Sequence, residues 1–331
     1  MKRRSFLQFV APSVALMLAL LALPLASTLW LSLRHCAPEI EWASVQQTSP
    51  FGAQTVVTQR TRVDASGRAV EHCGFVGAQN YRSILGLGLD KGTNGGSPPA
   101  EPPRNEYLSA WLFTLSYTLA TTPCILLGGL ALALAMQRVT RRLRGAFIAA
   151  SLLPFIITPV VGALAIKWLF RDHGLMPHLL SKVGVQVFWM AQAWSAQVLV
   201  MLYGVWHVLP FAFVVFYAGL QSVPQDSVEA AQLDGAGRWQ VLRHVTLPHL
   251  APLIGFVTLI HLMDAYRVFE PVLVLTQGAF TTSLQLLSYD LLLQENNPHK
   301  ASAAAMLTLI GIALLLIPLL RKTWREQRQG A

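Results

Sequence analysis

Three charged side chains occur at regular intervals inside one apolar stretch of the sequence. Asp264, Arg267 and Glu270 are three residues apart within Leu253–Leu275. On a single helix this spacing would place them along one stripe, where they could pair with one another. Two roles are open to them. In the first, they line a pathway and hydrogen-bond a polar solute. In the second, they form ion pairs with neighbouring helices, which offset the cost of about 2.5–3.5 kcal/mol for placing each charge inside a membrane.

A second group of polar and aromatic residues lies in Val198–Leu220, around a proline at position 210. The candidate pathway residues from both stretches are Tyr203, Trp206, His207, Asp264, Arg267 and Glu270. For the aromatic residues the alternative is ordinary packing or contact with lipid. For His207 it is a hydrogen bond to another helix, because a lone histidine indicates neither a metal nor a proton site.

Motifs of the common catalytic sites are absent from the sequence. It contains no Gly-Lys dipeptide, and therefore no G-x4-G-K-[ST] loop that would hold nucleotide phosphates. It also contains neither H-E-x-x-H nor G-x-S-x-G, which excludes zinc proteases and serine hydrolases of those types. We predict no catalytic residue, no metal site and no cofactor in this chain.

The candidate residues require a framework that spans a membrane. The chain has 331 residues, of which 53% are hydrophobic and 12% charged, a composition too apolar for a water-soluble fold. An all-α polytopic membrane protein is predicted, with spans at Phe6–Leu33, Ser109–Met136, Ala146–Phe170, Val198–Leu220, Leu253–Leu275 and Ala303–Leu320. The first run has no charge between Arg4 and Arg34, which favours a retained span over a cleaved signal peptide.

Lys and Arg residues indicate which loops face the cytoplasm. The N-terminal "KRR", the "RVTRRLR" turn, the region 229–252 and the C-terminal "RKTWREQR" are basic, so both termini are predicted inside. This topology, together with anionic lipid, accounts for the net charge of +9 without nucleic acid as a partner. The predicted regions are a first helix at 1–33, an extracytoplasmic loop at 34–108, a helical core at 109–320 that includes a cytoplasmic loop at 222–252, and a tail at 321–331.

The extracytoplasmic loop contains two of the three cysteines. Its "TVVTQRTRV" stretch alternates as a strand does and predicts a small β-rich part, whereas the Gly/Pro-rich Leu85–Arg104 is typical of a linker. Cys36 and Cys73 lie where an oxidising compartment would permit a disulfide. The sequence leaves open whether they pair.

The cytoplasmic loop is polar and is interrupted by glycines. Ser222 is the predicted N-cap of a helix that ends at Gly235 and Gly237. A second short helix is predicted from Arg238, before Leu247–Pro248 turns the chain into the next span. On its composition and periodicity alone, this region is interpreted as an ordinary amphipathic connector between two spans.

Its spacing, however, resembles the EAA loop of ABC-importer membrane subunits, E-A-A-x3-G-x9-I-x-L-P. Glu229-Ala230-Ala231 is followed after three residues by Gly235 and after nine more by Val245-Thr246-Leu247-Pro248, with Val in place of Ile. The stretches "AGLQSVP", "PVVGALAIKWLFRDHGLMPHLL" and "FEPVLVLTQG" are similar to the maltose-type sugar permeases, although "LTQGAF" replaces the Gly-Gly-Pro of many relatives. The resemblance implies a type I ABC importer permease fold.

The same resemblance implies a mechanical role for this loop, as a coupling helix that docks in a cleft of a cytoplasmic ATPase. The residues assigned to ATPase coupling are Glu229, Ala230, Ala231, Asp234, Gly235, Leu247 and Pro248. Glu229 is expected to form a salt bridge or to position the helix. The implied partners are a second permease, expected to be a homologue, two ATPase subunits that bind ATP and Mg, an external solute-binding protein, and the lipid of a bacterial inner membrane.

A carbohydrate or glycoside cargo is also implied by the resemblance. Sugar rings would stack on Tyr203 and Trp206, and Asp264 would bind a hydroxyl. Other polar cargoes, namely amino acids, polyamines or phosphate, are the alternative within the same importer class. A stand-alone proton-coupled carrier or a membrane enzyme would instead use the intramembrane charges as proton-relay or catalytic groups.

Overall fold

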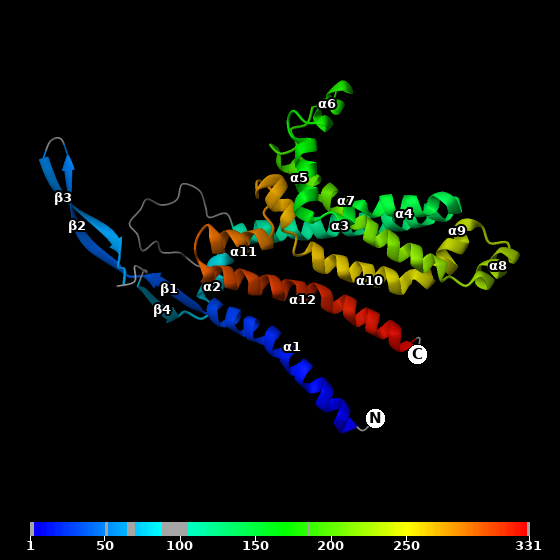
Figure 1. Ribbon diagram of the computed structural model, residues 1–331, viewed down its shortest axis with the longest axis horizontal. Coiled ribbons are helices and arrows are strands. Elements are labelled where there is room, and N and C mark those ends of the chain that lie inside the picture. Colours follow the sequence, from blue (N-terminus) through cyan, green and yellow to red (C-terminus); the bar gives the residue numbers. More distant parts are fainter. Residues whose placement is uncertain (1–2, 50–51, 65–69, 88–104, 185, 330–331) are drawn as a thin grey trace. The chain divides into compact units, whose positions relative to one another are not determined.

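The computed structural model describes residues 3–49, 52–64, 70–87, 105–184 and 186–329. Within these ranges the chain is mostly helical, as the all-α prediction requires, and it carries strands only in the loop after the first helix (Figure 1). The chain divides into two units, Met1–Asn105 with Ser288–Leu307, and Glu106–Leu287 with Thr308–Ala331. Most of the predicted linker lies at 88–104, outside the described residues.

The first unit begins with a long apolar helix and continues into two strand pairs. Its elements are α1 (Arg3–Ser32), β1 (Arg34–Pro38), β2 (Ile40–Ser49), β3 (Gly52–Thr61), β4 (Glu71–Phe75) and α2 (Gln79–Ile84). β1 pairs with β4 and β2 with β3, both antiparallel. Cys36 and Cys73 are directly opposite in the first pair and are joined by a disulfide, with their Cα atoms 4.0 Å apart.

Side-chain hydrogen bonds from α2 hold the end of α1. The amide of Asn80 donates to the carbonyls of Ser32 and Arg34, each at 2.8 Å, and the hydroxyls of Ser32 and Tyr81 lie 2.6 Å apart. Ser32 and Asn80 are buried, and buried polar groups are stable only when hydrogen-bonded. The bonds therefore fix where α1 ends.

The second unit is built around three long helices that lie beside one another (Figure 1). Its elements are α3 (Glu106–Gln137), α4 (Arg141–Ile156), α5 (Pro159–Phe170), α6 (Leu175–Lys182), α7 (Ala193–Gln221), α8 (Gln225–Leu233), α9 (Arg238–Val241), the π-helical turns η1 (Leu242–Thr246) and η2 (Val272–Thr276), and α10 (Leu247–Ala265). Two further helices, α11 (Leu284–Leu293) and α12 (Pro298–Gln329), run from one unit into the other. The core between α3, α7 and α10 includes the buried Ile125, Phe213, Phe216, Leu250 and Val257.

Small residues let α3 and α7 approach closely. A Cβ atom added to Gly129 of α3 would lie 2.8 Å from the Cβ of Ala212 and 3.0 Å from the backbone nitrogen of Phe213. Helices in membranes pack closely at such positions because lipid provides no hydrophobic force between them. Gly129 therefore sets the separation of the two helices.

Five of the described helices are long and apolar enough to cross a membrane, and a bent pair is the sixth candidate. The five correspond to the predicted spans at both ends of the chain and to the second, fourth and fifth. The predicted span at Ala146–Phe170 corresponds to the bent pair, in which Arg141–Ile156 and Pro159–Lys182 meet at an angle of 95° (Figure 1). Pro159 cannot donate the next helical hydrogen bond and forces Thr158 into an extended conformation, with ψ 142°.

The fifth span ends earlier than predicted. α10 ends at Ala265, and residues 266–269 form a turn before the chain becomes helical again at Glu270. Pro271 explains the break, because its ring would clash with the carbonyl of Arg267 in a continuous helix. Asp264, Arg267 and Glu270 therefore do not share one helical stripe, contrary to the prediction. Beyond η2, the "LTQGAF" segment turns with positive φ at Gln277, Gly278 and Phe280.

Candidate functional site

The candidate coupling segment begins where α7 ends. Ser222 is the C-cap of α7, and its hydroxyl donates to the carbonyl of Gly219 at 2.8 Å. It is not the N-cap of the next helix, as the sequence predicts, because Pro224 occupies that position. The reason is that α7 continues through Gln221 and needs Ser222 to terminate it.

Gly235 ends α8 as predicted. The N–H groups of Gly235 and Ala236 donate to the carbonyls of Gln232 and Ala231, each at 3.0 Å, and Gly235 has φ 84°. This left-handed conformation costs little for glycine and about 1–2 kcal/mol for other residues. The turn therefore fixes the length of α8 and the direction in which the chain leaves it.

α8 presents its side chains to the exterior of the chain. None of its residues is buried, and Leu233 at its end is 89% exposed. Glu229 and Ala230 are exposed and Ala231 is half-buried. The arrangement provides a short rigid helix with a carboxylate and a leucine available to a partner.

The chain does not turn at Leu247–Pro248, contrary to the prediction. α9, η1 and α10 instead form one helix from Arg238 to Ala265, 28 residues long. The wider π-helical turn at Leu242–Thr246 lies directly before Pro248, where it relieves the clash of a proline with the preceding turn. Leu247 and Pro248 thus begin α10 within a continuous helix that joins the coupling segment to the span.

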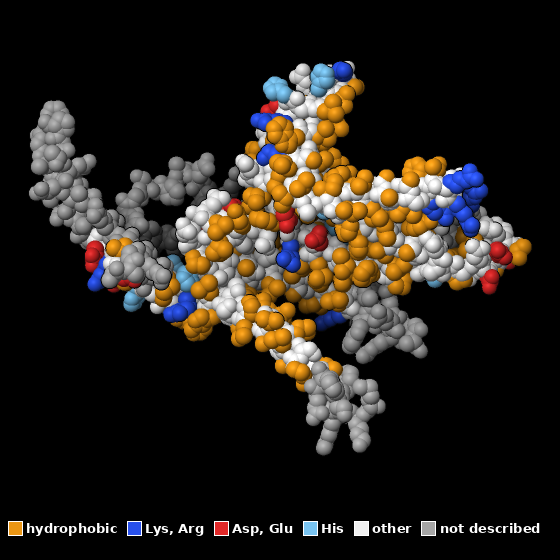
Figure 2. Space-filling model, viewed as in Figure 1, with side chains coloured by type: hydrophobic (Ala, Val, Ile, Leu, Met, Phe, Trp, Pro, Cys, Tyr) orange, Lys and Arg blue, Asp and Glu red, His pale blue; other side chains and the backbone are white. Residues whose placement is uncertain are grey.

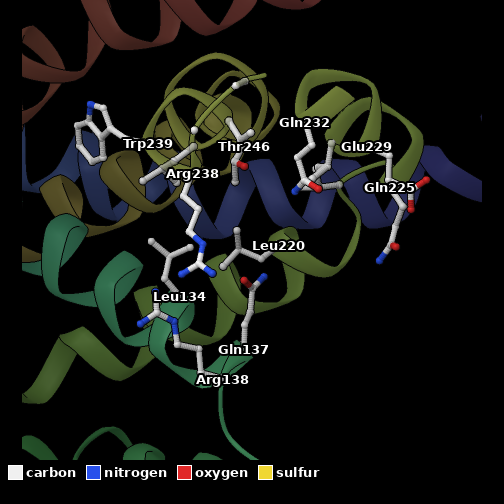
Figure 3. Close-up of a pocket in the computed structure, with 16 residues that line it drawn as sticks. Leu134, Gln137, Arg138, Leu220, Gln225, Glu229, Gln232, Arg238, Trp239 and Thr246 are labelled. Carbon is white, nitrogen blue, oxygen red and sulfur yellow. The ribbon is translucent and has the colours of Figure 1, made fainter. Parts of the chain in front are cut away.

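A cavity of about 1050 Å³ lies between the ends of α3 and α7 and the α8–α9 segment (Figure 3). Its apolar wall includes Leu134, Leu220, Val228 and Val241, and its polar wall includes Gln137, Arg138, Gln225, Glu229, Gln232 and Arg238. A smaller hollow of about 330 Å³ is lined by Ala231, Asp234 and Gly235. The coupling residues therefore border two recesses.

The aromatic candidates on α7 differ in how far they are available to a solute. Tyr203 is 2% exposed, and its hydroxyl donates to the carbonyl of Pro159 at 2.7 Å. Its ring stacks on that of His207, with centroids 5.6 Å apart. Trp206 is 38% exposed. Tyr203 thus joins α7 to α5, whereas Trp206 presents part of its ring outside the chain.

The three charged candidates lie close together without forming ion pairs, which are one of the two roles that the sequence leaves open. Asp264 is exposed at the end of α10, Arg267 is exposed in the following turn, and Glu270 is half-buried. Asp264 is near enough to Glu270, His207 and Arg267 for their charges to interact. Among the described residues, however, no ion pair within 4.0 Å involves any of the three. Figure 2 shows small groups of charged side chains within otherwise hydrophobic surface.

The structure also identifies polar residues that the sequence analysis did not select. His261 of α10 is buried, and its Nε2 lies 3.1 Å from the hydroxyl of Thr121 on α3. Lys167 of α5 donates to the carbonyl of Val274 at 2.7 Å. Both residues are polar side chains inside apolar runs, which are rare in membrane proteins, and this rarity is the sequence feature that could have identified them. Arg138 and Arg238, which the sequence indicates only as markers of topology, both line the larger cavity.

Comparisons with known proteins agree with this architecture. The family described as "Binding-protein-dependent transport system inner membrane component" matches residues 100–329. The chain is 29% identical to the trehalose transport system permease protein SugA of Mycobacterium tuberculosis (strain ATCC 25618 / H37Rv) over 95% of this chain and 87% of that protein. It is 29% identical to the trehalose/maltose transport system permease protein MalF of Thermococcus litoralis, over 65% of this chain and 69% of that protein.

A solved structure shares the fold. One chain in the crystal structure of a bacterial alginate ABC transporter, in complex with an alginate pentasaccharide-bound periplasmic protein, matches with a TM-score of 0.61 and 25% identity. The match covers 67% of this chain and 80% of that chain.

Proposed function

The chain belongs to the family of binding-protein-dependent transport system inner membrane components, and we propose that it forms the pathway for a carbohydrate or a glycoside. It is the permease subunit of a binding-protein-dependent ABC importer, a multi-pass protein of the inner membrane and not a catalytic subunit. The cargo class is supported by the two relatives named for trehalose and maltose transport, one of which matches over 95% of this chain. That match is the observation that carries the proposal.

The importer complex would contain a second permease, two ATPase subunits and an external binding protein. The alginate transporter supports this assembly, because it is similar in fold and its structure includes a periplasmic protein. ATP and Mg would be bound by the ATPase subunits. On this chain the exposed Glu229 and Leu233 of α8 would contact an ATPase subunit, with the small Ala230 and Ala231 allowing close approach.

The continuous helix from α9 to α10 supports a direct route for coupling. Its 28 residues correspond to about 42 Å at a rise of about 1.5 Å per residue. One end adjoins the Gly235 turn of the coupling segment, and the other carries Asp264. A movement of α8 driven by the ATPase subunits would therefore displace Asp264 as part of one rigid body.

The cargo pathway would use Asp264 and Trp206, whose side chains the chain itself leaves exposed. A carboxylate binds sugar hydroxyls, and the partly exposed indole provides a stacking surface. Tyr203 would contribute to the shape of the pathway rather than bind cargo through its hydroxyl, because that hydroxyl is already bonded to Pro159.

Uptake by the complete complex, reconstituted in vesicles with its binding protein, tests the function. We expect uptake of a labelled disaccharide that requires both ATP and the binding protein, with little uptake of amino acids, polyamines or phosphate. Uptake of one of these solutes in place of the sugar would refute the cargo class. Uptake without ATP or binding protein would instead favour a proton-coupled carrier.

Replacing Asp264 by Asn is expected to weaken cargo transport while leaving the complex assembled. The loss of a hydrogen bond to a charged group is expected to raise the KM for cargo about 10- to 100-fold. The measurement is uptake as a function of cargo concentration, with the amount of assembled complex determined in parallel. Asp172→Asn, an exposed carboxylate in the loop after α5, is the matched control. An unchanged KM with poor assembly would assign Asp264 a structural role instead.

A further inference from the structure

Two arginine side chains enter the 1050 Å³ cavity from different helices. Arg138 directly follows α3, and Arg238 is the first residue of α9. Figure 3 shows both guanidinium groups directed into the same part of the cavity, with the amide of Gln137 beside them. Residues 100 positions apart in the sequence thus bring two positive charges and an amide donor together.

Neither guanidinium has an acidic partner in the part of the chain that the structure describes. The ion pairs within 4.0 Å there are both made by Arg62, in the other unit. Glu229 also lines the cavity, but Figure 3 shows it on the α8 wall, away from the two arginines. Two cations that converge without a counter-ion repel each other, and an anion bound between them would remove that cost.

The remaining wall of the cavity indicates the chemistry of the anion. Beside the arginines it is lined by the side chains of Leu134, Leu220, Val223, Val241 and Leu242. Trp239, at the rim, is 69% exposed, as is typical of tryptophan at the level of lipid headgroups. The cavity lies at the ends of α3 and α7, two of the candidate spans, on the side that the basic residues predict to face the cytoplasm. A charged end and an apolar side next to a membrane match an amphiphile better than a free ion.

We propose that Arg138 and Arg238 bind the phosphate of an anionic phospholipid whose glycerol and upper acyl region lies against the apolar wall. Basic pockets between spans on the cytoplasmic side of a membrane are suited to such headgroups. The bound phosphate joins the end of α3 to the start of α9, and so fixes the base of the helix that carries the coupling segment. The binding is independent of the cargo, so it is tested separately from the proposed function.

Binding to the purified importer complex in neutral detergent tests this site. The probes are short-chain phosphatidylglycerol, short-chain phosphatidylcholine and inorganic phosphate, each titrated while the apparent Kd is measured. Phosphatidylglycerol is expected to bind most tightly. The double variant Arg138→Gln with Arg238→Gln is expected to weaken it by at least about tenfold, because two charge-assisted hydrogen-bonding groups are lost.

Matched controls separate this site from general attraction to basic surface. Arg141→Gln with Arg243→Gln removes the same charge from exposed arginines that do not line the cavity, and it is expected to leave the Kd within about twofold. Arg238→Lys keeps the charge and serves as a folded comparison if the double variant is unstable. It is expected to bind phosphatidylglycerol more tightly than Arg238→Gln does.

Three outcomes would overturn the proposal. Equal weakening by the control pair would show non-specific attraction. Inorganic phosphate binding as tightly as phosphatidylglycerol, with the same dependence on the two arginines, would show a site for free phosphate. Release of the ATPase subunits from the double variant, with lipid affinity unchanged, would show that the arginines bind an acidic residue of a partner protein.

Discussion

Uptake is expected to be abolished by Glu229→Lys, while the permease remains in the membrane. Glu229 is exposed on α8 and has no ion pair within the described chain, so its carboxylate is available to the ATPase subunit. Breaking a pair that becomes buried in the complex costs about 3–5 kcal/mol, which corresponds to more than a hundredfold weaker docking. Uptake in vesicles and co-purification of the ATPase subunits measure the two effects.

Two further variants define what is lost. Glu229→Gln keeps the size of the side chain, and it is expected to retain more uptake than the charge reversal does. Glu295→Lys reverses an exposed charge far along the chain from α8, and it is expected to leave ATPase docking unchanged. Normal uptake and normal ATPase recovery with Glu229→Lys would contradict the role that we propose for this carboxylate.

Gly129→Val is expected to prevent stable folding of the second unit. The new side chain would meet the Cβ of Ala212 and the backbone nitrogen of Phe213, and backbone atoms cannot move aside as a flexible side chain can. Overpacking of a tight interface costs about 1–3 kcal/mol and more when two helices must separate. The expected result is a large fall in the amount of monodisperse permease in detergent extracts and a lower Tm.

The matched control for this change is Gly145→Val on α4. A Cβ atom at Gly145 would meet nothing within 4 Å, so this variant has the same change in helix propensity without the collision. Gly128→Val is expected to be intermediate, because its nearest neighbour is the movable side chain of Leu209. Equal stability of the Gly129 and Gly145 variants would show that the α3–α7 contact is not limiting.

The number and approximate position of the spans could be predicted from the sequence because apolar runs determine them. Their interruptions could not. Pro159 and Pro271 each stand where an apolar run continues, and hydropathy gives no reason to end the helix there. At Pro248 the error is the opposite one: a break was predicted, but the helix continues, because a π-helical turn accommodates that proline. Proline marks a local strain, and the surrounding packing decides how the chain relieves it.

The helix and the turn of the candidate coupling segment were predictable because its residues are consecutive and their spacing is specific. The structure confirms the glycine turn at Gly235 and the helix before it. The partners of individual side chains were not predictable. Tyr203 bonds to Pro159 across 44 residues, and Arg138 reaches the same cavity as Arg238, because contacts between helices depend on their rotation and spacing.

The bend between α4 and α5 interrupts helical hydrogen bonding within the sixth candidate span. α4 has 16 residues and α5 has 12, about 24 Å and 18 Å of helix, so neither crosses a hydrocarbon layer of about 30 Å alone. Tyr203 satisfies the carbonyl of Pro159, but the extended backbone at Ile157 and Thr158 interrupts the helical hydrogen bonds. Acyl chains offer such groups no partner. Hydration of this bend, or a neighbouring subunit packed against it, is therefore a structural requirement of the folded permease.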